Sequence, residues 1–99
     1  MFRTLILTEL APERSQALLE RATAFGQSRA VCAVHWKSDI DVGQLMGAAA
    51  VAKLHGNADF LAQLGAARAE IASARTQGSQ PNRDCAAEAN ALALDRPLY

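Results

Sequence analysis

The chain has 99 residues and a formal net charge of zero, so it can form one small domain with a modest core. Its balanced charge excludes the basic surface that nucleic-acid binding requires, and it leaves no acidic tail. Alanine is the commonest of the apolar residues, which make up 51% of the chain, and this composition favours helix.

No stretch of the sequence is typical of a membrane segment or a secretion signal. The apolar run that ends before Glu9 is too short for a signal-peptide core, and no small-residue cleavage site follows it. The alanine-rich run from Val42 to Leu54 contains Gln44 and Lys53 and is too short to cross a bilayer. The sequence therefore predicts no membrane span.

The first quarter of the chain predicts two helices. Thr4 to Glu9 is typical of the end of a helix, and Pro12 suits the first position of the next one. An apolar stripe from Leu18 to Phe25 then leads to Gly26, which we expect to stop that helix.

Capping residues predict the next two helices. Ser28 can cap a short helix over residues 29–34, and Ser38 with Asp41 resembles a capping box that opens a longer helix ending near His55. Gly43 and Gly47 lie one turn apart in that helix, where each costs about 1 kcal/mol relative to alanine. We therefore expect another helix to pack closely against them.

The rest of the chain predicts a long helix, a linker and a short helix. Asn57 can cap the long helix, whose apolar face is formed by Phe60, Leu64, Ala67 and Ile71. Residues 76–82 are polar, and a last helix from Asp84 to Leu94 carries Cys85. No strand pattern or repeat is present, so we expect an all-α fold, with one helical unit over 1–75 and a linker with a short helix over 76–99.

Three side chains between these helices have the chemistry of a phosphoryl-transfer site. The guanidinium of Arg29 can hold two phosphate oxygens, and His35 can attack phosphorus through one ring nitrogen. Asp39, one helical turn later, is placed to accept the N–H of the other ring nitrogen. The same spacing also occurs by chance, however, and a His–Asp pair at the start of a helix is commonly only a capping contact.

The spacing S-R-x5-H-x3-D from Ser28 to Asp39, with Trp36 and Ser38 inside it, resembles a known signature. It is similar to the third signature of the type 2 phosphatidic acid phosphatase and vanadium haloperoxidase superfamily, and most of all to the class A bacterial non-specific acid phosphatases. The similarity extends to the segments 4–9 and 43–54. We therefore identify the chain as the C-terminal part of such a helical enzyme.

The resemblance implies a function and a set of roles. Ser28 and Arg29 would bind phosphate, His35 would form a phosphohistidine, and Asp39 would orient it. The substrate would be a phosphomonoester or its product inorganic phosphate, with no metal and no other cofactor. The resemblance also implies a periplasmic protein, or a cytoplasmic one if Met1 is a native start.

The chain departs from the family at two signatures. K-x6-R-P is absent, and so is P-S-G-H, which would supply backbone donors and the general-acid histidine. His55 is the only other histidine, and we interpret it as a residue favoured by the dipole at a helix C-terminus. Because one lost donor typically costs about 10²–10³ in rate, we expect the chain to be inactive alone.

The remaining expectations concern the cysteines, Trp36 and assembly. Cys32 and Cys85 could form a disulfide, and the alternative is two buried thiols. Trp36 is expected to pack beside the site rather than to stack on a substrate. The alternative to an enzyme is a non-catalytic helical module from a truncated gene that self-associates as a homo-oligomer through uncovered apolar faces.

Overall fold

The computed structural model describes residues 1–93, and within that range it is helical with no strand. This confirms the all-α fold. The elements are α1 (Phe2–Leu10), the 3₁₀ turn η1 (Pro12–Arg14), α2 (Ser15–Val31), α3 (Lys37–Leu54), α4 (Ala58–Thr76) and α5 (Cys85–Leu92). None of the described helices is long and apolar enough to cross a membrane.

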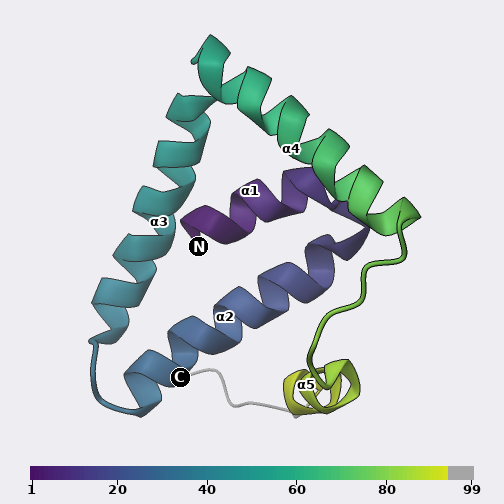
Figure 1. Ribbon diagram of the computed structural model, residues 1–99. Helices are drawn as coiled ribbons and strands as arrows, with labels where there is room; N and C mark the ends of the chain where they lie inside the picture. The colour runs from purple at the N-terminus through teal and green to yellow at the C-terminus, as the bar shows by residue number, and fades with distance from the viewer. Residues whose placement is uncertain (94–99) are drawn as a thin grey trace.

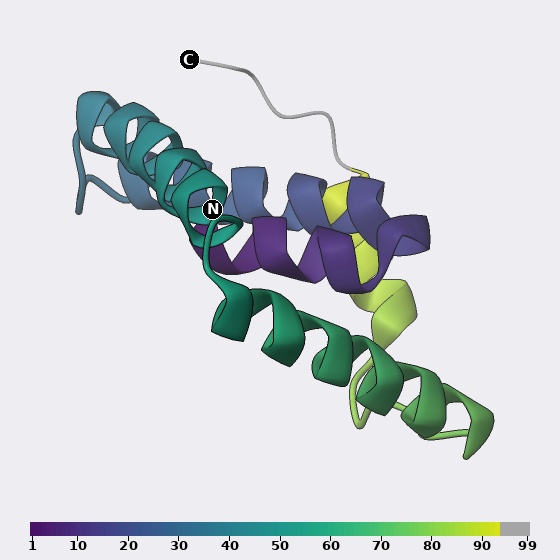
Figure 2. The same cartoon turned by 90° about the horizontal axis from the view of Figure 1, so that it is seen from above.

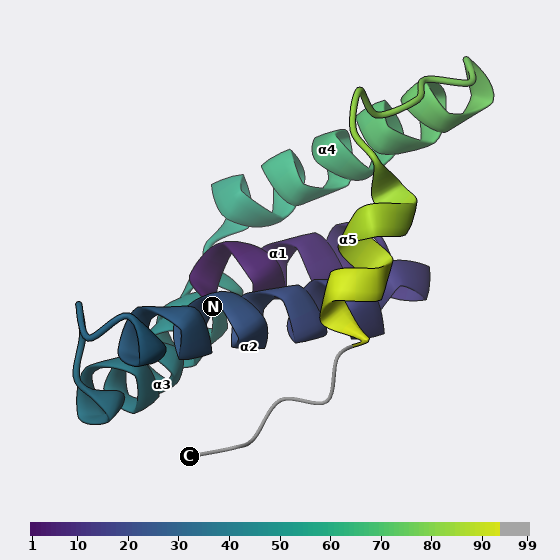
Figure 3. The same cartoon turned by 90° about the horizontal axis from the view of Figure 1, so that it is seen from below.

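The helices form an open, flattened triangle rather than a closed bundle. In Figure 1, α2, α3 and α4 form its three sides, and α1 lies inside it beside α2. Seen from above, α1 lies between α2 and α4 (Figure 2), and seen from below, α5 crosses α2 near the start of that helix (Figure 3). The extents of 39 × 35 × 19 Å reflect this flat shape.

Local sequence signals explain most helix boundaries. Pro12 lies at the start of η1, which leads directly into α2. The Oδ1 of Asn57 accepts the backbone N–H of Phe60 at 2.9 Å, which confirms the predicted cap of α4. Asp84 caps α5 in the same way, with Oδ1 2.9 Å from the backbone nitrogen of Ala87. Gly78, with φ of 70°, follows the end of α4 in a conformation that suits glycine.

The prediction that Gly26 ends a helix was wrong, because α2 continues through it to Val31. A Cβ at this position would lie 3.2 Å from the Cγ2 of Ile40, so the glycine allows α2 and α3 to approach closely. Ser28 is therefore not a cap either. It lies inside α2, and its Oγ donates to the backbone oxygen of Phe25 at 2.7 Å.

The predicted capping box of α3 was also wrong by two residues. The helix begins at Lys37, and the backbone N–H of Trp36 donates to Oδ2 of Asp39 at 3.0 Å. Asp41, the expected partner of Ser38, instead accepts from Nζ of Lys37 at 2.6 Å. Asp39, rather than Asp41, is thus the carboxylate that satisfies a free amide at the start of α3.

The two glycines of α3 differ in their surroundings. A Cβ at Gly47 would lie 3.1 Å from the backbone nitrogen of Phe2, so the predicted close helix contact is confirmed there, with α1 as the neighbour. A Cβ at Gly43 would meet nothing within 4 Å. Close packing therefore explains Gly47 but not Gly43.

The described part of the chain buries little apolar surface. Val51 and Leu64 are its buried hydrophobic residues, and the predicted apolar face of α4 is confirmed around Leu64 by the half-buried Phe60, Ala67 and Ile71. The radius of gyration is 15.6 Å, against about 13 Å for a compact domain of this length. The accessible surface of 7517 Å² likewise exceeds the roughly 5,400 Å² of a compact 10.5 kDa protein.

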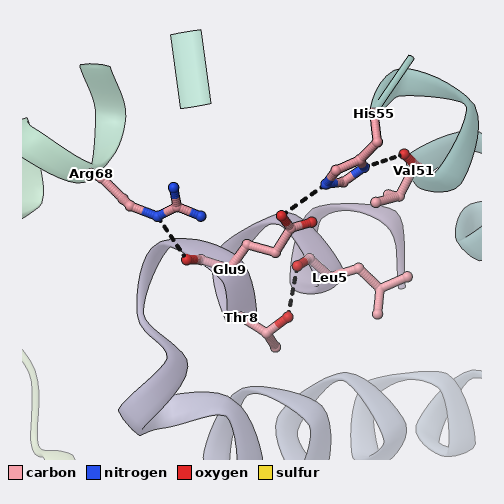
Figure 4. A network of polar contacts seen from close by, with 6 residues as sticks. All are labelled: Leu5, Thr8, Glu9, Val51, His55 and Arg68. Atoms are coloured by element: carbon pink, nitrogen blue, oxygen red, sulfur yellow. Dashed lines mark hydrogen bonds and ion pairs between the residues drawn. The ribbon is translucent and has the colours of Figure 1, made fainter. Parts of the chain in front are cut away.

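Polar contacts supplement this small core by linking helices. His55, just after α3, donates from Nε2 to Oε2 of Glu9 on α1 at 2.8 Å. Nε of Arg68 on α4 donates to the backbone oxygen of the same Glu9 at 3.2 Å, as Figure 4 shows. Arg75 near the end of α4 forms an ion pair with Glu13 in η1. Glu9 thus links α1 to the end of α3 and to α4.

Candidate functional site

The link between α2 and α3 brings His35 back toward Arg29. After Val31 the chain turns through Ala33, whose φ of 56° lies in the left-handed region and costs a non-glycine residue roughly 1–2 kcal/mol. The backbone amides of Val34 and His35 both donate to the carbonyl oxygen of Arg29, at 3.1 and 3.3 Å. This turn fixes the histidine beside the last turn of α2.

Three of the four predicted site residues line one cleft. Arg29 comes from α2, His35 from the link and Asp39 from the first turn of α3, around a volume of about 300 Å³. The other lining residues are Met1, Ala22, Phe25, Gly26, Ile40, Gly43 and Gln44. Ser28, whose hydroxyl is bonded inside α2, does not line this cleft. Gly43, which close packing did not explain, lines the same cleft, and the open space beside it is part of that cleft.

The His35–Asp39 pair is near but not hydrogen bonded. Nδ1 of His35 lies 3.8 Å from Oδ2 of Asp39, which is an ion-pair distance if the imidazole is protonated and too long for a hydrogen bond. The same Oδ2 accepts the Trp36 amide at 3.0 Å. Asp39 therefore acts as the cap of α3 in this structure, with His35 just beyond hydrogen-bond distance. Catalytic hydrogen bonds are often long in structures without substrate.

Both members of the pair are open to solvent. The side chains of His35 and Asp39 are 51% and 53% exposed, so their mutual attraction is screened by water. The arrangement can approach a phosphate with one guanidinium and one imidazole, but water is not excluded from it. A phosphoryl-transfer centre requires further donors around the equatorial oxygens.

Trp36 does not pack beside the site as predicted, because its side chain is 79% exposed. It lines a second, larger cleft of about 600 Å³, which His35 and Asp39 also border, with the apolar residues Ala30 and Val31 of α2 and Ala33 and Val34 of the α2–α3 link. The indole is therefore uncovered within the described residues.

Within residues 1–93 no group of three or more His, Cys, Asp or Glu side chains is arranged to hold a metal ion.

The two cysteines are exposed free thiols, so the buried-thiol alternative was wrong. Cys32 follows the end of α2. The helix α5 contacts α2 near its other end, where Arg21 lies 3.9 Å from Glu88. Arg21 is eleven residues from Cys32, which corresponds to about 16 Å along the helix axis. A Cys32–Cys85 bridge would require α5 to move. The bridge stays a prediction, which a non-reducing peptide map after aerobic purification can test.

Three curated proteins of similar sequence are named acid phosphatases. The chain is 44% identical over 78 residues to an acid phosphatase of Zymomonas mobilis, and 43% identical over 68 residues to a non-specific acid phosphatase of Providencia stuartii. It is 43% identical over 67 residues to a non-specific acid phosphatase of Salmonella typhimurium. The chain is homologous to part of the bacterial acid phosphatases. No protein-family model and no solved structure matches it.

The homology covers most of this chain but a minor share of the relatives. The Zymomonas match takes in 79% of the chain and 30% of the acid phosphatase, and the Providencia match 69% and 27%. This is consistent with the C-terminal fragment that the sequence predicts. A match of 78 residues in a chain of 99 must include positions 22–78, so Ser28, Arg29, His35 and Asp39 all lie within the matched region.

The contact between Glu9 and His55 was missed by the sequence analysis. The sequence places His55 correctly at the C-terminus of a helix, where Nδ1 bonds the backbone oxygen of Val51 at 2.8 Å. Its second partner, Glu9, lies 46 residues away in sequence. No local spacing rule joins residues that far apart, so only the packing of α1 on α3 reveals the pair.

Proposed function

We propose that this chain contributes the nucleophile and one phosphate-binding arginine to an acid phosphatase that hydrolyses phosphomonoesters through a phosphohistidine. The observation that carries the proposal is the shared cleft of Arg29, His35 and Asp39, inside a region that is 44% identical to an acid phosphatase of Zymomonas mobilis. Ser28, the second predicted phosphate contact, would have to leave its bond to the Phe25 carbonyl and turn into the cleft to take that role. A bacterial acid phosphatase of this kind would act in the periplasm.

The proposed chemistry has two displacements at phosphorus. Nε2 of His35 attacks the phosphorus of the ester, the P–O bond to the leaving alcohol breaks, and a proton from a general acid neutralises the alkoxide. Asp39 accepts Nδ1–H and stabilises the imidazolium. Water then attacks the phosphohistidine and releases inorganic phosphate and the free imidazole. The first step needs Asp39 to turn from the Trp36 amide toward His35.

The 99-residue polypeptide on its own should hydrolyse p-nitrophenyl phosphate at acid pH no faster than buffer. Its cleft offers one arginine and one histidine, and its sequence lacks the other two signatures, whose donors and general acid contribute factors of about 10²–10³ each. Turnover that disappears in the His35→Ala variant would contradict this expectation.

The roles can be tested in a chimera in which this chain replaces the matching part of the Providencia acid phosphatase. His35→Ala should remove the covalent phosphoenzyme, whereas Asp39→Asn should leave it forming slowly. Asp41→Asn is the matched control, because it makes the same charge change at a carboxylate bonded to Lys37 outside the cleft. The intermediate is trapped with denaturant at alkaline pH and detected by mass spectrometry. A phosphoenzyme in the His35→Ala chimera would overturn the assignment.

A second candidate function, a non-catalytic self-associating module, is favoured by a different observation. Large apolar side chains are exposed on α3, with Val42, Leu45 and Met46 at 56%, 68% and 62%. These positions follow the i, i+3, i+4 spacing of one helix face. Such a surface is typical of one that another chain or segment covers.

A further inference from the structure

The junction of α1, α3 and α4 contains a histidine whose two ring nitrogens both face acceptors. Nδ1 of His55 lies 2.8 Å from the backbone oxygen of Val51, and Nε2 lies 2.8 Å from Oε2 of Glu9. A neutral imidazole has a single N–H and can donate to only one of them. With Glu9 ionised, both hydrogen bonds can therefore form only when His55 carries its second proton.

From this geometry we infer that Glu9 and His55 form a proton-dependent clamp, which holds α1 against α3 and α4 when His55 is protonated and loosens when His55 is neutral. The inference does not depend on the proposed phosphatase activity. It concerns a contact at the opposite end of α3 from Asp39.

Charged groups of both signs surround His55, and the one that bonds its ring, Glu9, favours the protonated form. On α1, Glu9 is in contact, and on α4, Arg68 is bonded to the backbone oxygen of Glu9 rather than to its carboxylate. Asp59 lies in the first turn of α4, and Lys53 precedes His55 by two residues. Two hydrogen bonds raise the pKa of His55 above its ordinary value of 6.5, the one to the Val51 carbonyl being the larger cause and the one to Glu9 the smaller.

The clamp acts at one end of α1, and a steric contact acts at the other. Figure 4 shows the Glu9 carboxylate directed at His55 near the C-terminus of α1. At the N-terminus, Phe2 packs against Gly47 of α3. The ring of Phe60 on α4 lies edge-on to His55 with centroids 5.5 Å apart, so the histidine contacts all three helices directly or through Glu9. Met1, at the start of α1, borders the candidate site cleft.

The sign of the pH effect follows from the raised pKa. A histidine whose folded-state pKa exceeds its unfolded value stabilises the fold fully below the unfolded pKa of about 6.5. That contribution is lost as the pH rises through the folded-state pKa. Acidic conditions should therefore tighten the three-helix junction, and mildly alkaline conditions should loosen it.

The test is an NMR titration of the His55 ring in the full 99-residue chain, repeated in urea. The proposal expects His55 to lose its proton at a higher pH in the native chain than in urea, and at a lower pH in the Glu9→Gln variant than in the wild type. Glu20→Gln is the matched control, since Glu20 bonds Gln16 on the exposed face of α2 and the charge change is the same. Equal titration in native buffer and in urea would overturn the clamp, whether or not the variants fold.

A second measurement follows the helices themselves. After correction for intrinsic base catalysis, the amides of α1 should be better protected from hydrogen exchange at pH 6 than at pH 8. His55→Gln and Glu9→Gln should remove most of that difference, and Glu20→Gln should keep it. Protection of α1 that is independent of pH in the wild type would also overturn the inference.

Discussion

Asp39 has two possible partners, and this shapes what its substitution will do. Its Oδ2 is bonded to the Trp36 amide at 3.0 Å and lies 3.8 Å from Nδ1 of His35. One carboxylate oxygen thus both closes the start of α3 and faces the candidate nucleophile. The carboxylate has a structural role even where no reaction takes place.

Asp39→Ala should lower the free energy of unfolding by about 1 kcal/mol, because the Trp36 amide loses its acceptor. Asp39→Asn should lose less, since its side-chain oxygen can still accept that N–H. Ser38→Ala, which removes the residue first expected to cap α3, should have little effect. Denaturant unfolding followed by circular dichroism measures all three, and equal losses for Ser38→Ala and Asp39→Ala would contradict the cap.

Close contacts between the helices depend on single small residues. Gly26 lets α2 approach Ile40 of α3, and Gly47 lets α3 approach Phe2 of α1. At Gly26 the neighbour is the end of a side chain, whereas at Gly47 it is backbone, which yields less readily. The α1–α3 contact is therefore the less tolerant of the two.

Gly43→Ala should stabilise α3 by up to about 1 kcal/mol, because the new methyl group meets open space and alanine favours helix. Gly47→Ala should lose that gain and displace α1, because its Cβ would lie 3.1 Å from the Phe2 nitrogen. Thermal melts of the two variants provide a matched comparison within one helix. A Gly47→Ala protein that melts as high as Gly43→Ala would show that α1 does not pack there.

The molecule as a whole exposes more surface than a compact domain of its mass, and large apolar side chains contribute to it. Its accessible area exceeds that of a compact protein of its mass by roughly 2,000 Å², which is more than the roughly 600–1,000 Å² that a standard protein interface buries on each partner. Covering that excess would restore the burial that a chain of this length needs. A second copy of the chain is one way to cover it.

At micromolar concentration the 99-residue chain should be a dimer or a larger oligomer. The contact should involve the first residues and the exposed face of α3 around Leu45, since burying apolar surface contributes roughly 25 cal/mol per Å². Light scattering measures the mass. Leu45→Lys should weaken association, whereas Gln63→Lys on the exposed surface of α4 should not. A single 10.5 kDa species with a cooperative melt would contradict the prediction.

Much of this structure follows from short-range signals. The Asn57 cap, the Pro12 start, the apolar face around Leu64 and the break after Thr76 all act within a few residues, so the sequence was enough to predict them. The motif from Ser28 to Asp39 likewise identified the acid phosphatase relatives, because its residues lie close together in sequence.

Features that depend on contacts between distant segments could not be predicted in this way. Gly26 is compatible both with a helix stop and with a helix contact, and only the position of Ile40 decides between them. The cleft shared by Arg29, His35 and Asp39 depends on the turn at Ala33, and the partner of His55 depends on how α1 packs. Helix propensity and capping are local free energies, whereas side-chain packing and long-range hydrogen bonds exist only once the helices have met.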